Sequence, residues 1–213
     1  MKFLHLLTFA SFALAVPTAR QQTVIGTVSN AVGTLKSGVD ANAAAVDAVA
    51  EVQGNVAAEV TAAISANLQA IADGLVEAAA TIVGVTTGAA GGVAGAIVGL
   101  TQTQIANLAA SILVAVQAIL QITAVVTVTA TDLTPAIQTA VGDETDAIKD
   151  AINPFVGPLL ILADAISDAS FFATVAIMGL QAAAESLCGV QAAAQGSIGL
   201  NELDISGATP CSL

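Results

Sequence analysis

The sequence contains no tryptophan, no tyrosine, one histidine (His5) and two cysteines, and its four basic residues stand against sixteen acidic ones. These scarcities exclude several classes of function. With almost no cations to displace the counterions of phosphates, the chain is not expected to bind nucleic acid. The same shortage argues against electrostatic attraction to anionic membranes. Any contact with lipid would therefore have to be hydrophobic.

The N-terminus has the pattern of a secretory signal peptide. Lys2 precedes an apolar run from Phe3 to Leu14, and Ala13 and Ala15 supply the small residues that signal peptidase requires. The apolar run is too short to span a bilayer, which argues against the alternative of a retained anchor. We therefore expect residues 1–15 to be removed and the protein to be secreted, extracellular or associated with a cell wall.

Removal of residues 1–15 would also remove His5, and with it any Ser-His or Cys-His nucleophile. Two cysteines without histidine do not make a zinc site, and no phosphate-binding loop or dinucleotide-binding motif is present. In an oxidising compartment Cys188 and Cys211 are predicted to form a disulfide. We expect neither a cofactor nor a resident metal.

Carboxylates are the remaining candidates for chemistry. One acidic cluster lies along a single predicted helix: Asp143, Glu144, Asp146 and Asp150. It lacks the glycine and the ligand spacing of a calcium loop. Asp164 and Asp168 lie four residues apart and could form an acid–base pair, but such pairs are also common on surfaces. We interpret both groups as solvated helix faces and predict that the protein is not an enzyme.

Apolar residues recur at helical spacing through most of the chain, as in the stripe formed by Val28, Val32, Leu35 and Val39. The sequence predicts an all-α, alanine-rich bundle of about six helices in a single domain over residues 16–195, followed by an irregular tail over 196–213. Helices are predicted over 21–39, from an Asp40 N-cap to residue 75 in one or two pieces, over 80–100, over 105–130, over 135–153, over 158–166, and up to a cap at Gly189. The β-branched end of the 105–130 segment could instead be a strand.

The centre of the chain is uncharged: residues 78–131, 54 in all, contain no ionisable side chain. The polar turn at 101–104 divides it into two apolar segments. Six glycines of the first segment fall within an arc of about 100° when placed on a helix: Gly84, Gly88, Gly91, Gly92, Gly95 and Gly99. This register predicts a helical hairpin with a smooth glycine face against which another helix packs closely.

Two environments remain open for this predicted hairpin. Each segment has about the length needed to cross a bilayer, so constitutive or triggered membrane insertion is possible. The second segment, however, carries a polar stripe that suits a hydrogen-bonded seam or a wet side and is costly against lipid. The stripe consists of Gln104, Asn107, Ser111, Gln117 and Gln121. A buried hairpin in a soluble protein is the alternative.

Residues 21–79, with the sequence TVIGTVSNAVGTLKSGVDANAAAVDAVAEV, resemble the start of the fungal family of hydrophobic-surface-binding proteins and cell-wall galactomannoproteins. This resemblance implies a helical bundle, an extracellular or wall location, and binding of apolar surfaces or lipids. It assigns no functional residue. We therefore expect a non-enzymatic protein that binds hydrophobic surfaces or lipids. The alternatives are a toxin-like or effector protein that inserts the 78–131 hairpin into membranes, and a structural wall protein with protein partners only.

Overall fold

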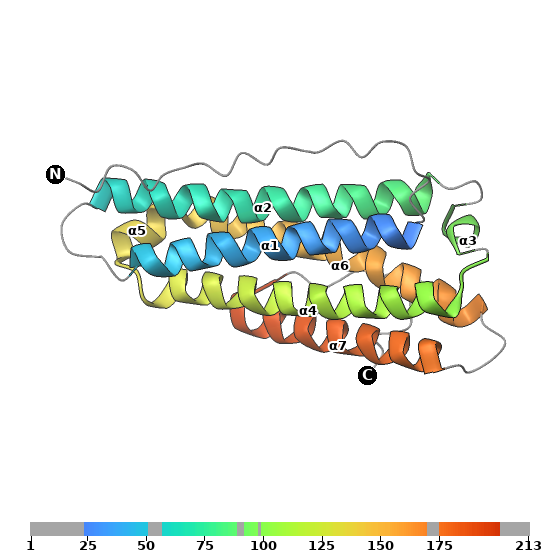
Figure 1. Cartoon of the computed structure of the whole chain (residues 1–213). Helices are drawn as coiled ribbons and strands as arrows, with labels where there is room; N and C mark the ends of the chain where they lie inside the picture. Colours follow the sequence, from blue (N-terminus) through green and yellow to red (C-terminus); the bar gives the residue numbers. More distant parts are fainter. Residues whose placement is uncertain (1–23, 51–56, 89–91, 98, 170–174, 201–213) are drawn as a thin grey trace.

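The computed structural model describes residues 24–50, 57–88, 92–97, 99–169 and 175–200 (Figure 1). Within these ranges the chain is helical and has no strand, which confirms the all-α prediction. The β-branched end of the 105–130 segment is helical. The helices are α1 (Val24–Ala50), α2 (Ala57–Thr87), α3 (Gly92–Ala96), α4 (Gln102–Thr131), α5 (Pro135–Ala140), α6 (Gly142–Ala169) and α7 (Val175–Ile198).

The five long helices form a bundle in which chain direction alternates along the sequence. In Figure 1, α1, α4 and α7 run one way, and α2 and α6 run the other way. Helix α1 packs against α2 and α4, α7 packs against α4 and α6, and α6 closes the ring against α2. The short helices α3 and α5 lie at opposite ends, which we call the α3 end and the α5 end.

The apolar stripes point into the ring and form its core. In α1, the predicted stripe of Val28, Val32, Leu35 and Val39 is buried, which confirms that periodicity. Phe155 of α6 is also fully buried. Apart from Cys188, the other described residues of the hydrophobic core are aliphatic. Full burial of an isoleucine, leucine or valine side chain contributes roughly 1.5–3 kcal/mol.

The predicted boundary at Asp40 is wrong. Helix α1 continues through Asp40 to Ala50, and α2 begins at Ala57. Asp40 does not cap a helix; its carboxylate pairs with Lys36 one turn earlier. The segment after Asp40 is rich in alanine, the residue with the most favourable helix propensity, and therefore prolongs the helix.

Helix α6 passes through Pro154 and Pro158, where the sequence predicted the end of one helix and the start of another. A proline inside a helix removes a backbone donor and costs about 3 kcal/mol. Here Phe155, Val156 and Leu159 are fully buried beside the two prolines. Packing of α6 on its neighbours therefore outweighs the local preference.

Helix α7 also extends further than predicted. It passes through the exposed Gly189 and ends at Ile198, so the first residues of the predicted 196–213 tail are helical. The cause is again packing, because Gln191, Ala194 and Ile198 are buried beyond the predicted cap. Residues 201–213 lie outside the described residues.

The glycine-rich stretch is not one continuous helix. Helix α2 ends at Thr87, and the short α3 contains Gly95. Gly92 and Gly99 have φ values of 65° and 75°, a left-handed conformation that glycine adopts readily. Each glycine costs a helix about 1 kcal/mol relative to alanine, and this local penalty prevails here. Gly91 lies outside the described residues.

The predicted glycine face is also wrong. Gly84 is exposed on α2, and a Cβ atom added there would meet nothing within 4 Å. The same holds for Gly92 and Gly99. At Gly88 the nearest atom to an added Cβ is the Gly84 carbonyl oxygen, at 2.5 Å, which belongs to the same chain segment. No second helix comes within 4 Å of a Cβ added at Gly84, Gly88, Gly92 or Gly99.

The predicted 78–131 hairpin is replaced by a different arrangement. Helix α1 packs against both α2 and α4, so the two apolar segments are not a closely packed pair. The predicted polar turn does separate them. Thr101 is the N-cap of α4 and forms a capping box with Gln104, in which each side chain bonds the other residue's backbone N–H.

Candidate functional site: an uncharged face

The outer side of α4 carries no charge along its whole length. Its exposed positions recur at steps of three and four and span about 37 Å at 1.5 Å per residue. They are Ala106, Ala110, Leu113, Gln117, Leu120, Ala124, Thr127 and Thr131. Leu113 and Leu120 are 47% and 51% exposed. A surface helix ordinarily carries charged residues on its solvent side, so this composition is unusual.

The neighbouring helices extend this surface. Residues 24–35 of α1 and 78–88 of α2 also lack ionisable side chains, and Val83 of α2 is 40% exposed. Because α1 packs against α2 and α4, the outer sides of the three helices adjoin (Figure 1). We call these exposed residues of 24–35, 78–88 and 102–131 the uncharged face.

A groove of about 450 Å³ crosses the uncharged face between α1 and α4. It is lined by Ile25, Gly26, Ser29, Asn30, Val32, Gly33, Gln104, Asn107, Ala110, Ser111 and Val114. Ser29 Oγ and Ser111 Oγ lie 2.7 Å apart and join the two helices, and Ser111 Oγ also donates to the Asn107 carbonyl. The groove therefore combines an apolar lining with several uncharged polar side chains.

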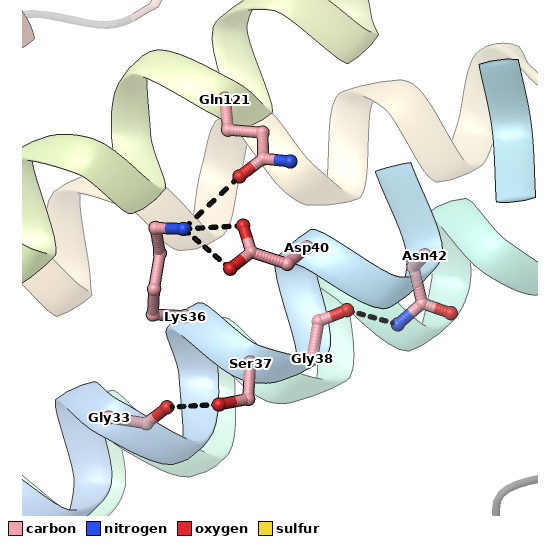
Figure 2. Close-up of polar contacts among 7 residues, drawn as sticks. All are labelled: Gly33, Lys36, Ser37, Gly38, Asp40, Asn42 and Gln121. Carbon is pink, nitrogen blue, oxygen red and sulfur yellow. Dashed lines mark hydrogen bonds and ion pairs between the residues drawn. The ribbon is translucent and has the colours of Figure 1, made fainter. Parts of the chain in front are cut away.

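Beyond the groove, toward the α5 end, a charged cluster closes the α1–α4 seam. The Lys36 ammonium pairs with the Asp40 carboxylate one turn further along α1. It also donates to Gln121 Oε1 of α4, at 3.4 Å (Figure 2). This cluster marks where the uncharged part of α1 ends.

The residues of the polar stripe predicted on α4 therefore lie in two different environments. Ser111 and Gln121 face α1 and form hydrogen bonds across the seam. Gln104 and Asn107 line the groove, and Gln117 is exposed. Both interpretations of the stripe, a seam and a wet side, describe part of it.

The acidic residues lie mainly away from the uncharged face. Among the residues the structure describes, no group of three or more His, Cys, Asp or Glu could hold a metal ion. Asp143, Asp146 and Asp150 are exposed on α6, and Asp168 is exposed near the C-terminal end of the same helix. Glu144 is only partly exposed and accepts a hydrogen bond from Ser65 of α2.

Four helices are long and apolar enough to cross a membrane by length and composition. The spans are Ala58–Thr87, Gln102–Thr131, Gly142–Ala169 and Val175–Ile198. Between 39% and 50% of the most apolar window of each is buried within the bundle. Part of each window is therefore already packed inside the folded protein.

Only one of the two cysteines of the predicted disulfide lies among the described residues. Cys188 is buried on α7, whereas Cys211 lies outside the described residues, as do residues 1–15. The disulfide and the signal peptide remain predictions from the sequence.

No family model, curated protein or solved structure matches this chain. The resemblance to the fungal family therefore stays a prediction from residues 21–79. The groove was not predicted, because α1 and α4 are about 80 residues apart in the sequence and only the fold brings them together.

Proposed function

We propose that this is a secreted, non-enzymatic protein that binds hydrophobic surfaces or lipids through its uncharged face. The observation that carries the proposal is that the uncharged face, formed by residues 24–35, 78–88 and 102–131 of three adjoining helices, has no ionisable side chain. An apolar phase excludes charge because a charged side chain loses its hydration there. A face that lacks charge can contact such a phase without that penalty.

The folded protein would bind such a surface weakly. A half-exposed leucine or valine contributes roughly 1 kcal/mol when the remaining area is covered. Val83, Leu113 and Leu120 together would supply about 3 kcal/mol, which corresponds to weak, reversible adsorption. Tight binding would require the helices to separate and expose core residues. The length and hydropathy of α2, α4, α6 and α7 support such an opening.

Adsorption to hydrophobic beads tests the proposal. The double variant Leu113→Glu/Leu120→Glu places two charges on the uncharged face and removes two exposed apolar side chains. We expect adsorption to weaken by at least about tenfold, since the lost contacts are worth roughly 2 kcal/mol.

The matched control is Ile161→Glu/Met178→Glu. These residues are 42% and 53% exposed on α6 and α7, outside the uncharged face. The control therefore adds the same two charges and also removes two exposed apolar side chains, but elsewhere on the surface. Equal weakening by the two double variants, or no weakening by either, would show that the uncharged face is not the binding surface.

A second candidate function is insertion into a lipid bilayer. The four helices of membrane-spanning length favour it. The test is release of dye from phosphatidylcholine vesicles by the wild-type protein. Release would support insertion, whereas binding to the vesicles without release would leave surface adsorption as the function.

A further inference from the structure

The groove between α1 and α4 has the chemistry of a binding site for a neutral headgroup. We propose that it binds the hydroxyl-rich, uncharged headgroup of an amphiphile, a sugar or glycerol group, whose alkyl chain then lies on the uncharged face. This inference rests on the proposed function and names its ligand class. Three observations support it. The groove has side-chain amides that form no hydrogen bond with the described residues, it has no ionisable lining residue, and it adjoins the apolar outer side of α4.

The groove offers hydrogen-bonding groups that the protein itself does not use. Among the described residues, the side-chain amides of Asn30 and Asn107 have no hydrogen-bond partner. Gln104 uses its carbonyl oxygen in the capping box of α4, and no described residue accepts from its NH₂ group. A carboxamide both donates and accepts, as a hydroxyl does, so several of them around one groove match a polyol.

The groove has no charge with which to bind an ionic headgroup. None of its lining residues is ionisable. The nearest cation along α1, Lys36, is already paired with Asp40 and bonded to Gln121. Phosphate and carboxylate headgroups are bound by charge-assisted hydrogen bonds from Arg or Lys, which are absent here. A neutral headgroup is the class that remains.

An apolar path leads out of the groove. Ala110 belongs both to the groove and to the outer side of α4. Leu113 and Leu120 follow on that side and are separated by about 10 Å along the helix. An alkyl chain leaving the groove would lie over these two side chains. The groove volume of about 450 Å³ lies within the usual range for small-ligand sites.

The probe is an alkyl glucoside below its critical micelle concentration, added to the isotope-labelled protein. Side-chain amide signals of Asn30, Asn107 and Gln104 should shift and saturate. Glucose alone tests whether the alkyl chain is needed, and an alkyl sulfate of the same chain length tests whether the headgroup is needed. We expect both to bind at least about tenfold more weakly than the alkyl glucoside.

Gly33 lines the groove, and an added Cβ there meets nothing within 4 Å, so we expect Gly33→Leu to occupy part of the groove. The matched control is Gly189→Leu on α7, where an added Cβ is equally unobstructed. We expect Gly33→Leu to weaken glucoside binding by at least about tenfold and Gly189→Leu to leave it unchanged.

Each other outcome contradicts the inference. Equal binding of the alkyl sulfate would show that the tail alone is recognised, and equal binding of glucose would show a sugar site without lipid. Loss of binding in both glycine variants, or in neither, would place the glucoside elsewhere. If no glucoside binds while bead adsorption is normal, the headgroup site is wrong and the proposed function stands. If adsorption also fails, both are wrong.

Discussion

Glu144 is a partly buried carboxylate whose two oxygens have different surroundings. Oε1 accepts a hydrogen bond from Ser65, whereas Oε2 is buried and has no partner among the described residues. The Ser65 hydroxyl is therefore the only described side chain that stabilises this carboxylate. Losing one partner of a buried polar pair generally costs more than losing both.

We therefore predict that Ser65→Ala lowers the free energy of unfolding by about 1–2 kcal/mol, because it leaves the carboxylate without a donor. In a Glu144→Leu background the same substitution should cost less than about 0.5 kcal/mol. Urea denaturation followed by circular dichroism measures both. An equal cost in the two backgrounds would show that the hydrogen bond does not couple them.

Two glycines should respond to alanine in opposite directions. Gly84 is exposed within α2 and has space for a Cβ, so Gly84→Ala should stabilise the protein by about 0.5–1 kcal/mol through helix propensity. Gly92 has a positive φ, so Gly92→Ala should destabilise it by roughly 1–2 kcal/mol. Thermal or urea unfolding measures both changes. A stabilising effect at Gly92 would contradict the assigned backbone conformation.

At the residue scale, the sequence predicted burial better than backbone conformation. The spacing of Val28, Val32, Leu35 and Val39 identified core residues because a helix repeats every 3.6 positions. The glycines after Gly84 have an equally regular spacing, yet the chain leaves the helix there. Glycine has no side chain to bury, so its register carries no packing energy that could hold a helix together.

Helix α6 is continuous although its own sequence, with two internal prolines, disfavours a helix there. Pro154 is exposed in its interior and leaves the Asp150 carbonyl without the usual backbone donor. We predict that Pro154→Ala raises the free energy of unfolding by about 1–2 kcal/mol by restoring that donor. Pro135→Ala is the control, because Pro135 opens α5, where a missing N–H has no helical partner. Chemical denaturation compares them, and equal effects would contradict this explanation.

At the element scale, the helix start predicted at Pro135 is present, whereas the start predicted at Asp40 is not. The Thr101 capping box lies where the sequence predicted only a polar turn. The stops at Asn153-Pro154 and Gly189 failed because buried residues on either side hold α6 and α7 in place. Local propensity is a weak prior that tertiary packing can override.

At the scale of the whole molecule, the acidic excess should limit stability through self-repulsion. Sixteen acidic residues stand against four basic ones. Raising sodium chloride from about 0.01 M to about 0.15 M shortens the Debye length from roughly 30 to 8 Å. We predict an increase of about 1 kcal/mol in the free energy of unfolding. A decrease would show that ion pairs such as Lys36–Asp40 outweigh the repulsion.

The binding surface was predictable only in part. The uncharged block 78–131 can be read from the sequence because it is contiguous. This block lies beside residues 24–35 because α1 packs between α2 and α4. No local sequence pattern predicts which helices pack together. The groove residues were visible only as separate polar positions on two distant helices.

The separation of charge within the bundle has a consequence for any solid that it coats. Exposed acidic residues collect on α6, which packs mainly against α2 and α7 and not against α1, as in Asp143, Asp146 and Asp150. A monolayer lying with its neutral side down would turn these carboxylates toward the water. A waxy particle covered in this way would become wettable, and two such particles would repel each other in dilute salt.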